Sequence, residues 1–417
     1  MKYLERIVED IFQLKMSASG AVLVRGPKAC GKTEMSKQYA KSVLEVDRDP
    51  NVEEFMATSP ARLLTGDTPR LIDEWQEQPK LWIYIRHEVD DRKKPGQFIL
   101  TGSSTPNEVA KMHSGAGRFG VIEMRTMTWR ELGYSTGVVS LGGLLKGEKI
   151  KIVDHETELD DIIARMIRGG WPRLIDMSQK SAAEANRDYI DLIANVDISR
   201  VSSVKRDPVK AKNLLKSLAR NIATPAEITT IEADVRENEV VDMSRPTIMD
   251  YLGALERLMI VEDQPAWNTH IRSSASLRKT PKRHLADVSL AIAVLHADKQ
   301  KLLDELRYTG FLFESLVIHD LRVYAQANDA TVSYYRDSTG LEVDAIVEKA
   351  NGDWAAFEVK LGPGKIEEAT DNLRSLADVV DAEKKGHPKS LNVIVGTGVS
   401  YTRADGINVI SLASLGY

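Results

Sequence analysis

The first 160 residues alternate short apolar runs with apolar residues at helical spacing. Apolar runs of strand length occur at 21–24, 71–72 and 98–100. Met35, Tyr39 and Val43 recur at a spacing that predicts a helix between the first two runs. Strands that alternate with helices are typical of a parallel α/β sheet.

The middle of the chain, from about 161 to 284, has mostly helical patterns. Helices are predicted near 209–222 and 226–235, and Ser244 would cap a third. A short strand, Ile260–Asp263, follows the third helix. Three helices and a strand predict a winged-helix-like module.

The last part, from about 285, predicts a second α/β domain. A helix is expected near 310–325 and another near 365–380, with strands at 331–336, 341–349, 354–361, 391–395 and 407–410. The predicted domains are therefore residues 1–160, 161–284 and 285–417.

Composition narrows the class of protein. The chain has 417 residues with a net charge of −5, so it is not a polycation that coats nucleic acid. A single cysteine, Cys30, excludes an intramolecular disulfide and favours a reducing cytoplasm. The longest stretch without charged residues, Leu132–Leu145, is too short for a membrane span. We expect a soluble cytoplasmic protein with no membrane partner.

The clearest chemical motif is a phosphate-binding loop after the first strand. Its residues match G-x-x-x-x-G-K-[ST] and are Gly26, Pro27, Lys28, Ala29, Cys30, Gly31, Lys32 and Thr33. Backbone N–H groups of such a loop surround phosphates, Lys32 would place a charge on them, and Thr33 would bind Mg²⁺. A strand before the loop and a helix after it make the match specific.

Polar residues follow the next two strands of the first domain. Asp73 would hold Mg²⁺ through water, and Glu74 would orient the attacking water. Thr101–Ser104 ends the strand at 98–100, and Ser103 is a candidate to contact the γ-phosphate. A turn of small polar residues explains Thr101–Ser104 equally well.

These motifs resemble a known group of proteins. Together with Gly117–Phe119, they are similar to prokaryotic AAA+-type P-loop ATPases whose C-terminal region is of unknown function and resembles a restriction endonuclease. The resemblance implies five parallel strands, ATP as the nucleotide, and Arg118 as an arginine finger or sensor. A finger that acts in trans would require a homo-oligomer.

Contact of the middle domain with double-stranded DNA stays open. Basic residues gather between Arg200 and Arg220 and between His270 and His284. The helix after Ser244 has mixed charges, and packing or contact with a protein partner is the alternative.

The predicted hairpin of the last domain gathers charged residues. A turn centred on Asn351 places Asp344 opposite Glu358, and the period of two puts Lys360 on the face of Glu358. Glu314, on the preceding helix, would add a third acid. Two or three carboxylates with a lysine suit Mg²⁺-assisted phosphodiester hydrolysis and resemble the PD-(D/E)XK nuclease fold. A solvated charged face is the alternative.

Three uses of ATP compete at this point. The first is a Mg²⁺-dependent ATPase that drives a DNA-associated, nuclease-like module. The second is an ATP-dependent switch or scaffold that acts on a protein partner with little turnover and an inactive nuclease fold. The third is transfer of phosphate to a small molecule, for which most of the chain has no obvious role.

Overall fold

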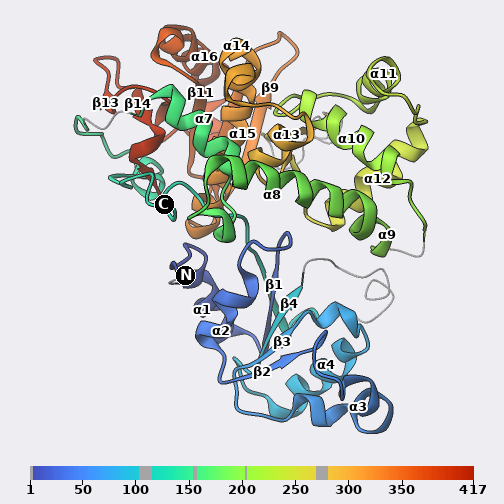
Figure 1. Cartoon of the computed structure of the whole chain (residues 1–417). Helices are drawn as coiled ribbons and strands as arrows, with labels where there is room; N and C mark the ends of the chain where they lie inside the picture. Colours follow the sequence, from blue (N-terminus) through green and yellow to red (C-terminus); the bar gives the residue numbers. More distant parts are fainter. Residues whose placement is uncertain (1–2, 103–114, 154–156, 202–203, 269–279) are drawn as a thin grey trace.

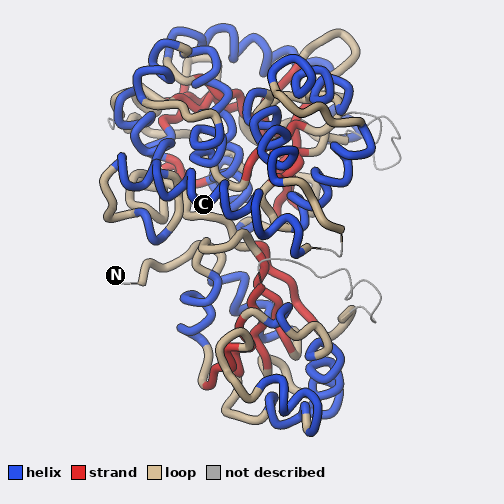
Figure 2. The backbone as a smooth tube through the Cα atoms, turned by 45° about the vertical axis from the view of Figure 1, so that its right-hand side comes forward, coloured by secondary structure: helices blue, strands red, loops and turns tan. Residues whose placement is uncertain are grey.

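The computed structural model describes residues 3–102, 115–153, 157–201, 204–268 and 280–417. These residues form a smaller N-terminal body and a larger body that holds the middle and the end of the chain (Figure 1). In the smaller body the strands run side by side, with helices around them (Figure 2). No helix among the described residues is long and apolar enough to cross a membrane.

The N-terminal body is built on five parallel strands in the order β2-β3-β4-β1-β5. Its elements are α1 (Glu9–Ala18), β1 (Ala21–Arg25), α2 (Lys32–Tyr39), β2 (Ser42–Glu45), α3 (Val52–Thr58), β3 (Arg70–Asp73), α4 (Leu81–Arg92), β4 (Phe98–Gly102) and β5 (Phe119–Glu123). The apolar run of β4 is buried along its whole length, as expected for a central strand of a parallel sheet. The predicted parallel α/β sheet is confirmed.

One predicted helix ends earlier than its spacing indicates. Helix α2 stops at Tyr39, and Val43 lies in β2, where it pairs with Leu71 of β3. Pairing with a neighbouring strand outweighs the helical spacing. The prediction that Val43 belongs to the helix was wrong.

The middle of the chain is helical, as predicted. Its elements are α7 (Leu159–Arg168), α8 (Gln179–Leu192), a π-helical segment (Ile193–Asp197), α9 (Ile198–Arg200), α10 (Pro208–Arg220), α11 (Ile228–Asn238), α12 (Arg245–Arg257), β7 (Val261–Gln264), β8 (Lys282–Leu285), α13 (Val288–Val294) and α14 (Lys299–Asp304). The helix expected after Ser244 is α12. Strand β7 pairs antiparallel with β8, a strand that the sequence pattern did not indicate.

The chain ends in a mixed sheet with the order β13-β14-β12-β11-β10-β9. Its elements are α15 (Leu306–Ala327), β9 (Ala330–Arg336), β10 (Glu342–Lys349), β11 (Trp354–Lys360), α16 (Ile366–Val379), α17 (Ala382–Lys385), β12 (Leu391–Val395), β13 (Tyr401–Thr402) and β14 (Asn408–Ser411). Ala345 pairs with Phe357, and Glu348 with Trp354. This register confirms the hairpin centred on Asn351.

Both faces of the C-terminal sheet are covered. Phe357 packs in an apolar cluster that includes α15, whereas Ala356 packs in a second cluster with Leu373 of α16. Glu358 is only 2% exposed. Glu358 is therefore buried while Asp344 and Lys360 on the same face are half-buried, and the buried charge needs a partner inside the protein.

The middle helices and the C-terminal sheet share a core. One apolar cluster runs from α7 and α8 through α13 to α15 and β11. The segment that leaves the N-terminal sheet also joins this body, because β6 (Val139–Ser140) pairs with β15 (Leu415–Gly416). The predicted border between residues 284 and 285 falls inside β8, and the domain borders stay predictions.

Candidate functional site

The phosphate-binding loop joins β1 to α2. Ala29 and Gly31 have positive φ angles of 62° and 104°, and the second favours glycine. A Cβ atom at Gly26 would lie 2.0 Å from the carbonyl oxygen of Met124, so a larger residue does not fit there. The first N–H groups of α2 have no carbonyl partner in the helix. The loop therefore offers N–H donors to an anion.

The Lys32 ammonium lies inside the loop against neutral partners. The residue is 5% exposed, and its ammonium group donates to the carbonyl oxygens of Gly26 at 3.0 Å and Pro27 at 2.8 Å. Both partners are neutral, so the positive charge is not cancelled. The ammonium is thus available to phosphate oxygens at the loop.

A hydroxyl and a carboxylate meet beside Lys32. The Thr33 hydroxyl donates to Asp73 Oδ1 at 2.8 Å, and the Thr101 hydroxyl donates to the same oxygen. Asp73 ends β3 and Thr101 lies in the adjacent β4, so the parallel strands bring them to one edge of the sheet. Oxygen ligands of this kind suit Mg²⁺. The residues fit a magnesium ion that is bound together with a nucleotide.

Glu74 follows Asp73 with an unusual backbone. Its φ angle is 52°, a region that residues other than glycine rarely adopt. Burial raises the pKa of Glu74, while a hydrogen bond from Gln76 and the charge of Lys32 oppose the rise. A raised pKa makes this carboxylate a better proton acceptor.

One predicted site residue, Arg118, is not found at the loop. The Arg118 carbonyl accepts a hydrogen bond from Ala21 N, so the length of β1 separates Arg118 from Gly26. Its guanidinium pairs with Asp90 at 2.6 Å. A finger role for Arg118 would therefore require a second copy of the chain. Ser103 lies outside the described residues.

The larger body also contacts the loop, which the sequence did not indicate. The Lys28 ammonium lies 2.6 Å from Asp197 Oδ1, and the Tyr189 hydroxyl donates to the Lys28 carbonyl at 3.3 Å. Within the N-terminal body, Arg6 also donates a hydrogen bond to the carbonyl oxygen of Cys30 in the loop, at 2.9 Å. Asp197 ends the π-helical segment and Tyr189 lies in α8, far along the chain from the loop. No local pattern could have identified these contacts.

The basic run between Arg200 and Arg220 is largely neutralised. Its ion pairs are Arg206 with Asp250, Lys212 with Asp191, Lys216 with Glu239, and Arg220 with Asp234 and Glu239. Cations that already hold carboxylates are poor phosphate ligands. These ion pairs leave less positive charge for phosphate on the surface that the sequence predicted.

A second cluster of charges lies on the C-terminal sheet and includes a lysine that the sequence reasoning missed. Lys282 of β8 is 1% exposed. Its ammonium lies 2.8 Å from Glu314, 2.7 Å from Glu342 and 3.4 Å from Asp344. Burial would lower the pKa of Lys282, but the three carboxylates raise it well above its usual range. Lys282 therefore stays protonated at neutral pH.

The predicted trio of Asp344, Glu358 and Lys360 is brought together beside Lys282. Lys360 Nζ lies 2.6 Å from Glu358 and 4.0 Å from Asp344. Burial and the charge of Asp344 raise the pKa of Glu358 to about 8. Burial likewise raises the pKa of Glu314 to about 8. The cluster opens into a cavity of about 780 Å³.

These carboxylates do not fit a metal ion as arranged. Among the described residues, no group of three His, Cys, Asp or Glu side chains is placed to hold one. The physical reason is Lys282, whose ammonium lies between Glu314 and Asp344, where a divalent cation would have to bind. The expected metal role of Glu314, Asp344 and Glu358 stays a prediction, which this arrangement of the described residues does not favour.

Comparison with known proteins adds three family matches. Residues 18–133 match the model of an AAA domain. Residues 159–301 and 309–415 match two domains of unknown function, DUF8612 and DUF4143.

The N-terminal body is an AAA-family P-loop ATPase domain. Most of the rest of the chain matches domains of unknown function.

Similar whole proteins were also found. Uncharacterized proteins of Mycobacterium tuberculosis and Mycobacterium bovis are each 25% identical over 348 residues, which is 81% of this chain and 70% of theirs. A Walker-type ATPase of Pyrococcus abyssi has a solved structure with a TM-score of 0.43 and 11% identity. The match covers 68% of this chain and 93% of the Pyrococcus abyssi chain.

Proposed function

We propose that this protein binds Mg-ATP at the loop of Gly26–Thr33 and hydrolyses it. The contact between Thr33 and Asp73, beside the uncompensated charge of Lys32, supports this proposal most strongly. Lys32 and the loop N–H groups would hold the phosphates, while Thr33 and Asp73 would hold the ion. Mg²⁺, when bound, neutralises charge on the phosphate oxygens. Glu74 would orient the attacking water and accept its proton.

Nucleotide binding would be transmitted to the larger body through Lys28. Its ammonium is paired with Asp197, and a phosphate at the loop competes with that carboxylate for the same cation. Tyr189 contacts the backbone of the same residue. ATP would therefore loosen one contact between the bodies, and loss of the γ-phosphate would restore it.

A second candidate concerns the C-terminal domain. The hairpin register and the cluster of Asp344, Glu358 and Lys360 support the PD-(D/E)XK-like fold. Lys282, however, favours a version of that fold without metal-dependent cleavage. The chain would then be an ATP-dependent switch or scaffold for a protein partner. The alternative is a DNA-associated module that cleaves or holds double-stranded DNA.

Steady-state hydrolysis of Mg-ATP, with and without double-stranded DNA, tests these proposals. Lys32→Ala serves as the blank, and we expect it to lower the rate by about 10²–10³-fold. DNA that raises a Lys32-dependent rate would support the DNA-associated module. Binding of ATP without turnover in either condition would support the switch. Equal rates in wild type and Lys32→Ala would reject the proposed site.

A further inference from the structure

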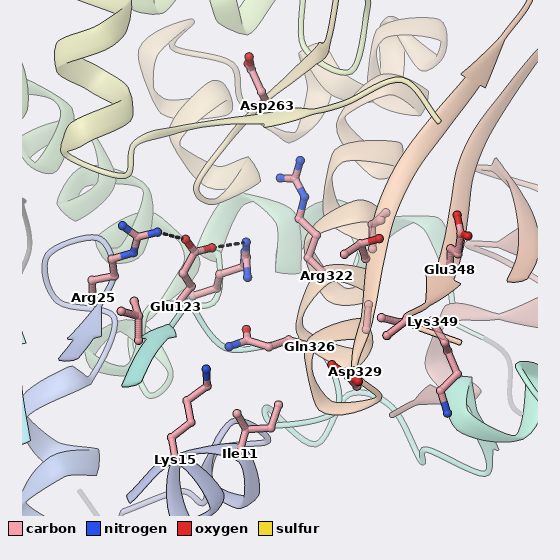
Figure 3. Close-up of a pocket in the computed structure, with 17 residues that line it drawn as sticks. Ile11, Lys15, Arg25, Glu123, Asp263, Arg322, Gln326, Asp329, Glu348 and Lys349 are labelled. Atoms are coloured by element: carbon pink, nitrogen blue, oxygen red, sulfur yellow. Dashed lines mark hydrogen bonds and ion pairs between the residues drawn. The ribbon is translucent and has the colours of Figure 1, made fainter. Parts of the chain in front are cut away.

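A second large cavity lies between the two bodies of the molecule. Its volume is about 840 Å³, and five cationic and four acidic side chains line it. Lys15 of α1 and Arg25 of β1 face it from the N-terminal body, and Arg322 of α15 faces it from the larger body (Figure 3). This cavity is distinct from the phosphate loop, although Arg25 directly precedes Gly26.

A chain of alternating charges forms one wall of the cavity. Arg25 pairs with Glu123, and Glu123 lies 3.4 Å from Arg125. Arg125 lies 3.0 Å from Glu262, which lies 2.9 Å from Arg322. The chain has three cations and two carboxylates, so one positive charge is in excess. An excess charge that is removed from water is unfavourable unless an anion balances it.

The spare donors lie at the two ends of this chain, of which only the Arg322 end is largely removed from water, since the Arg25 side chain is 41% exposed. Arg322 has a side chain that is 9% exposed, and its Nη2 has no hydrogen-bond partner among the described residues. Arg25 Nε likewise has no partner within the described part of the chain. Burial lowers the pKa of Arg322, and Glu262 only partly offsets it. Both guanidinium groups therefore have donors to spare.

Two of the acids on the cavity wall are already engaged elsewhere. Asp263 lies 3.6 Å from Arg283, and Glu348 lies 2.5 Å from Lys385. Asp329, which follows α15, also lines the cavity. Lys15 and Lys349 add two cations. With those two acids engaged, the five cations outnumber the other acids that line the cavity.

We propose that this cavity binds a phosphate-bearing ligand between Arg25 and Arg322, with Lys15 as a third contact. Arginine offers paired N–H donors that match phosphate oxygens, and spare donors in a partly buried cavity strengthen such bonds. The phosphate would belong to a small phosphate ester or to the backbone of a nucleic acid. The ligand would join the two bodies and touch the residue next to the phosphate loop.

The test uses the full chain with Lys32→Ala, which weakens anion binding at the phosphate loop. Radiolabelled pyrophosphate is titrated by equilibrium dialysis without Mg²⁺. Arg322→Gln in this background should weaken binding by at least about tenfold, because a charge-assisted hydrogen bond is lost. Lys15→Gln should weaken it several-fold. Arg236→Gln is the matched control, since Arg236 is an exposed cation on α11.

The variants are chosen to separate binding from folding. Lys15 is half-buried on α1, so Lys15→Gln tests the site while the buried ion pair of Arg322 with Glu262 stays intact. Equal affinity in all the variants, or no saturable binding to Lys32→Ala, would overturn the proposal. A labelled single-stranded oligonucleotide then identifies the source. If the oligonucleotide binds in an Arg322-dependent way and pyrophosphate displaces it, the ligand is a nucleic acid. If pyrophosphate binds but the oligonucleotide does not, the ligand is a small phosphate ester.

Discussion

The two charged sites of this molecule hold their lysines in opposite ways. Lys32 of the phosphate loop donates to two neutral carbonyl oxygens, whereas Lys282 is surrounded by three carboxylates. Neutral partners leave a charge free to attract phosphate, but carboxylates cancel it. The first site is therefore prepared for a ligand, and the second is already balanced internally.

The largest effect that separates the two lysines should be on stability. Lys282→Met leaves the buried Glu314 and the half-buried Glu342 and Asp344 without their cation, and we expect a loss of about 3–5 kcal/mol in the free energy of unfolding. Lys32→Met should cost much less, because the hydrogen-bond partners of its ammonium are neutral carbonyl oxygens. Urea unfolding followed by tryptophan fluorescence measures both. Equal losses would show that the two lysines do not differ in this way.

A comparable loss of folding stability is expected for Glu262→Gln, which lies where the two bodies meet. Burial would raise the pKa of Glu262, but the charges of Arg125 and Arg322 outweigh it and hold the pKa at about 2. This corresponds to about 3 kcal/mol of stability at neutral pH, which Glu262→Gln should remove.

The same variant has a distinctive pH dependence. Because the folded pKa lies below the unfolded value of 4.5, the stabilisation is complete above pH 4.5 and is lost as the pH falls toward 2. The difference in unfolding free energy between wild type and Glu262→Gln should shrink over that range. A difference that stays constant with pH would rule out the assigned pKa.

Mg²⁺ should stabilise the fold through the phosphate loop only when ATP is bound, and should not stabilise it through the cluster around Lys282. With ATP at about 100 times its Kd, Mg-ATP should stabilise the fold by about 2.7 kcal/mol. Mg²⁺ alone should not, since Lys282 fills the place between Glu314 and Asp344. Thermal unfolding with Mg²⁺, with Mg-ATP, and with EDTA measures this. Stabilisation by Mg²⁺ alone that Asp344→Asn abolishes would restore the metal site.

The smallest effect concerns the contact between Lys28 and Asp197. Asp197→Asn removes the carboxylate that competes with phosphate, so the Kd for ATP should fall about two- to fivefold, as for other partly exposed ion pairs. Isothermal calorimetry on Asp197→Asn and on Asp191→Asn, a matched change in the same region, measures it. An unchanged or weaker affinity would argue against competition for Lys28.

The sequence predicted best what depends on neighbouring residues. The loop is one continuous motif, and the period of two with a single turn sets the register of Asp344 against Glu358. Both follow from local geometry, so both could be derived without the rest of the chain.

Features that depend on distant segments were not predictable. Lys282 lies in a run of basic residues that resembled a phosphate surface, and its three carboxylates come from α15 and β10. Arg118 is close to glycines in sequence, but the direction of β1 places it at the far end of the sheet. Pairing between strands likewise decided the place of Val43.

The central claim is that the loop of the N-terminal domain hydrolyses ATP through Glu74. Its most direct test compares wild type and Glu74→Gln for the affinity of Mg-ATP and for steady-state phosphate release. We expect similar affinity and a rate about 10²–10⁴-fold lower in Glu74→Gln, because proton transfer to the carboxylate is lost. Phosphate release at the wild-type rate in Glu74→Gln would contradict the claim.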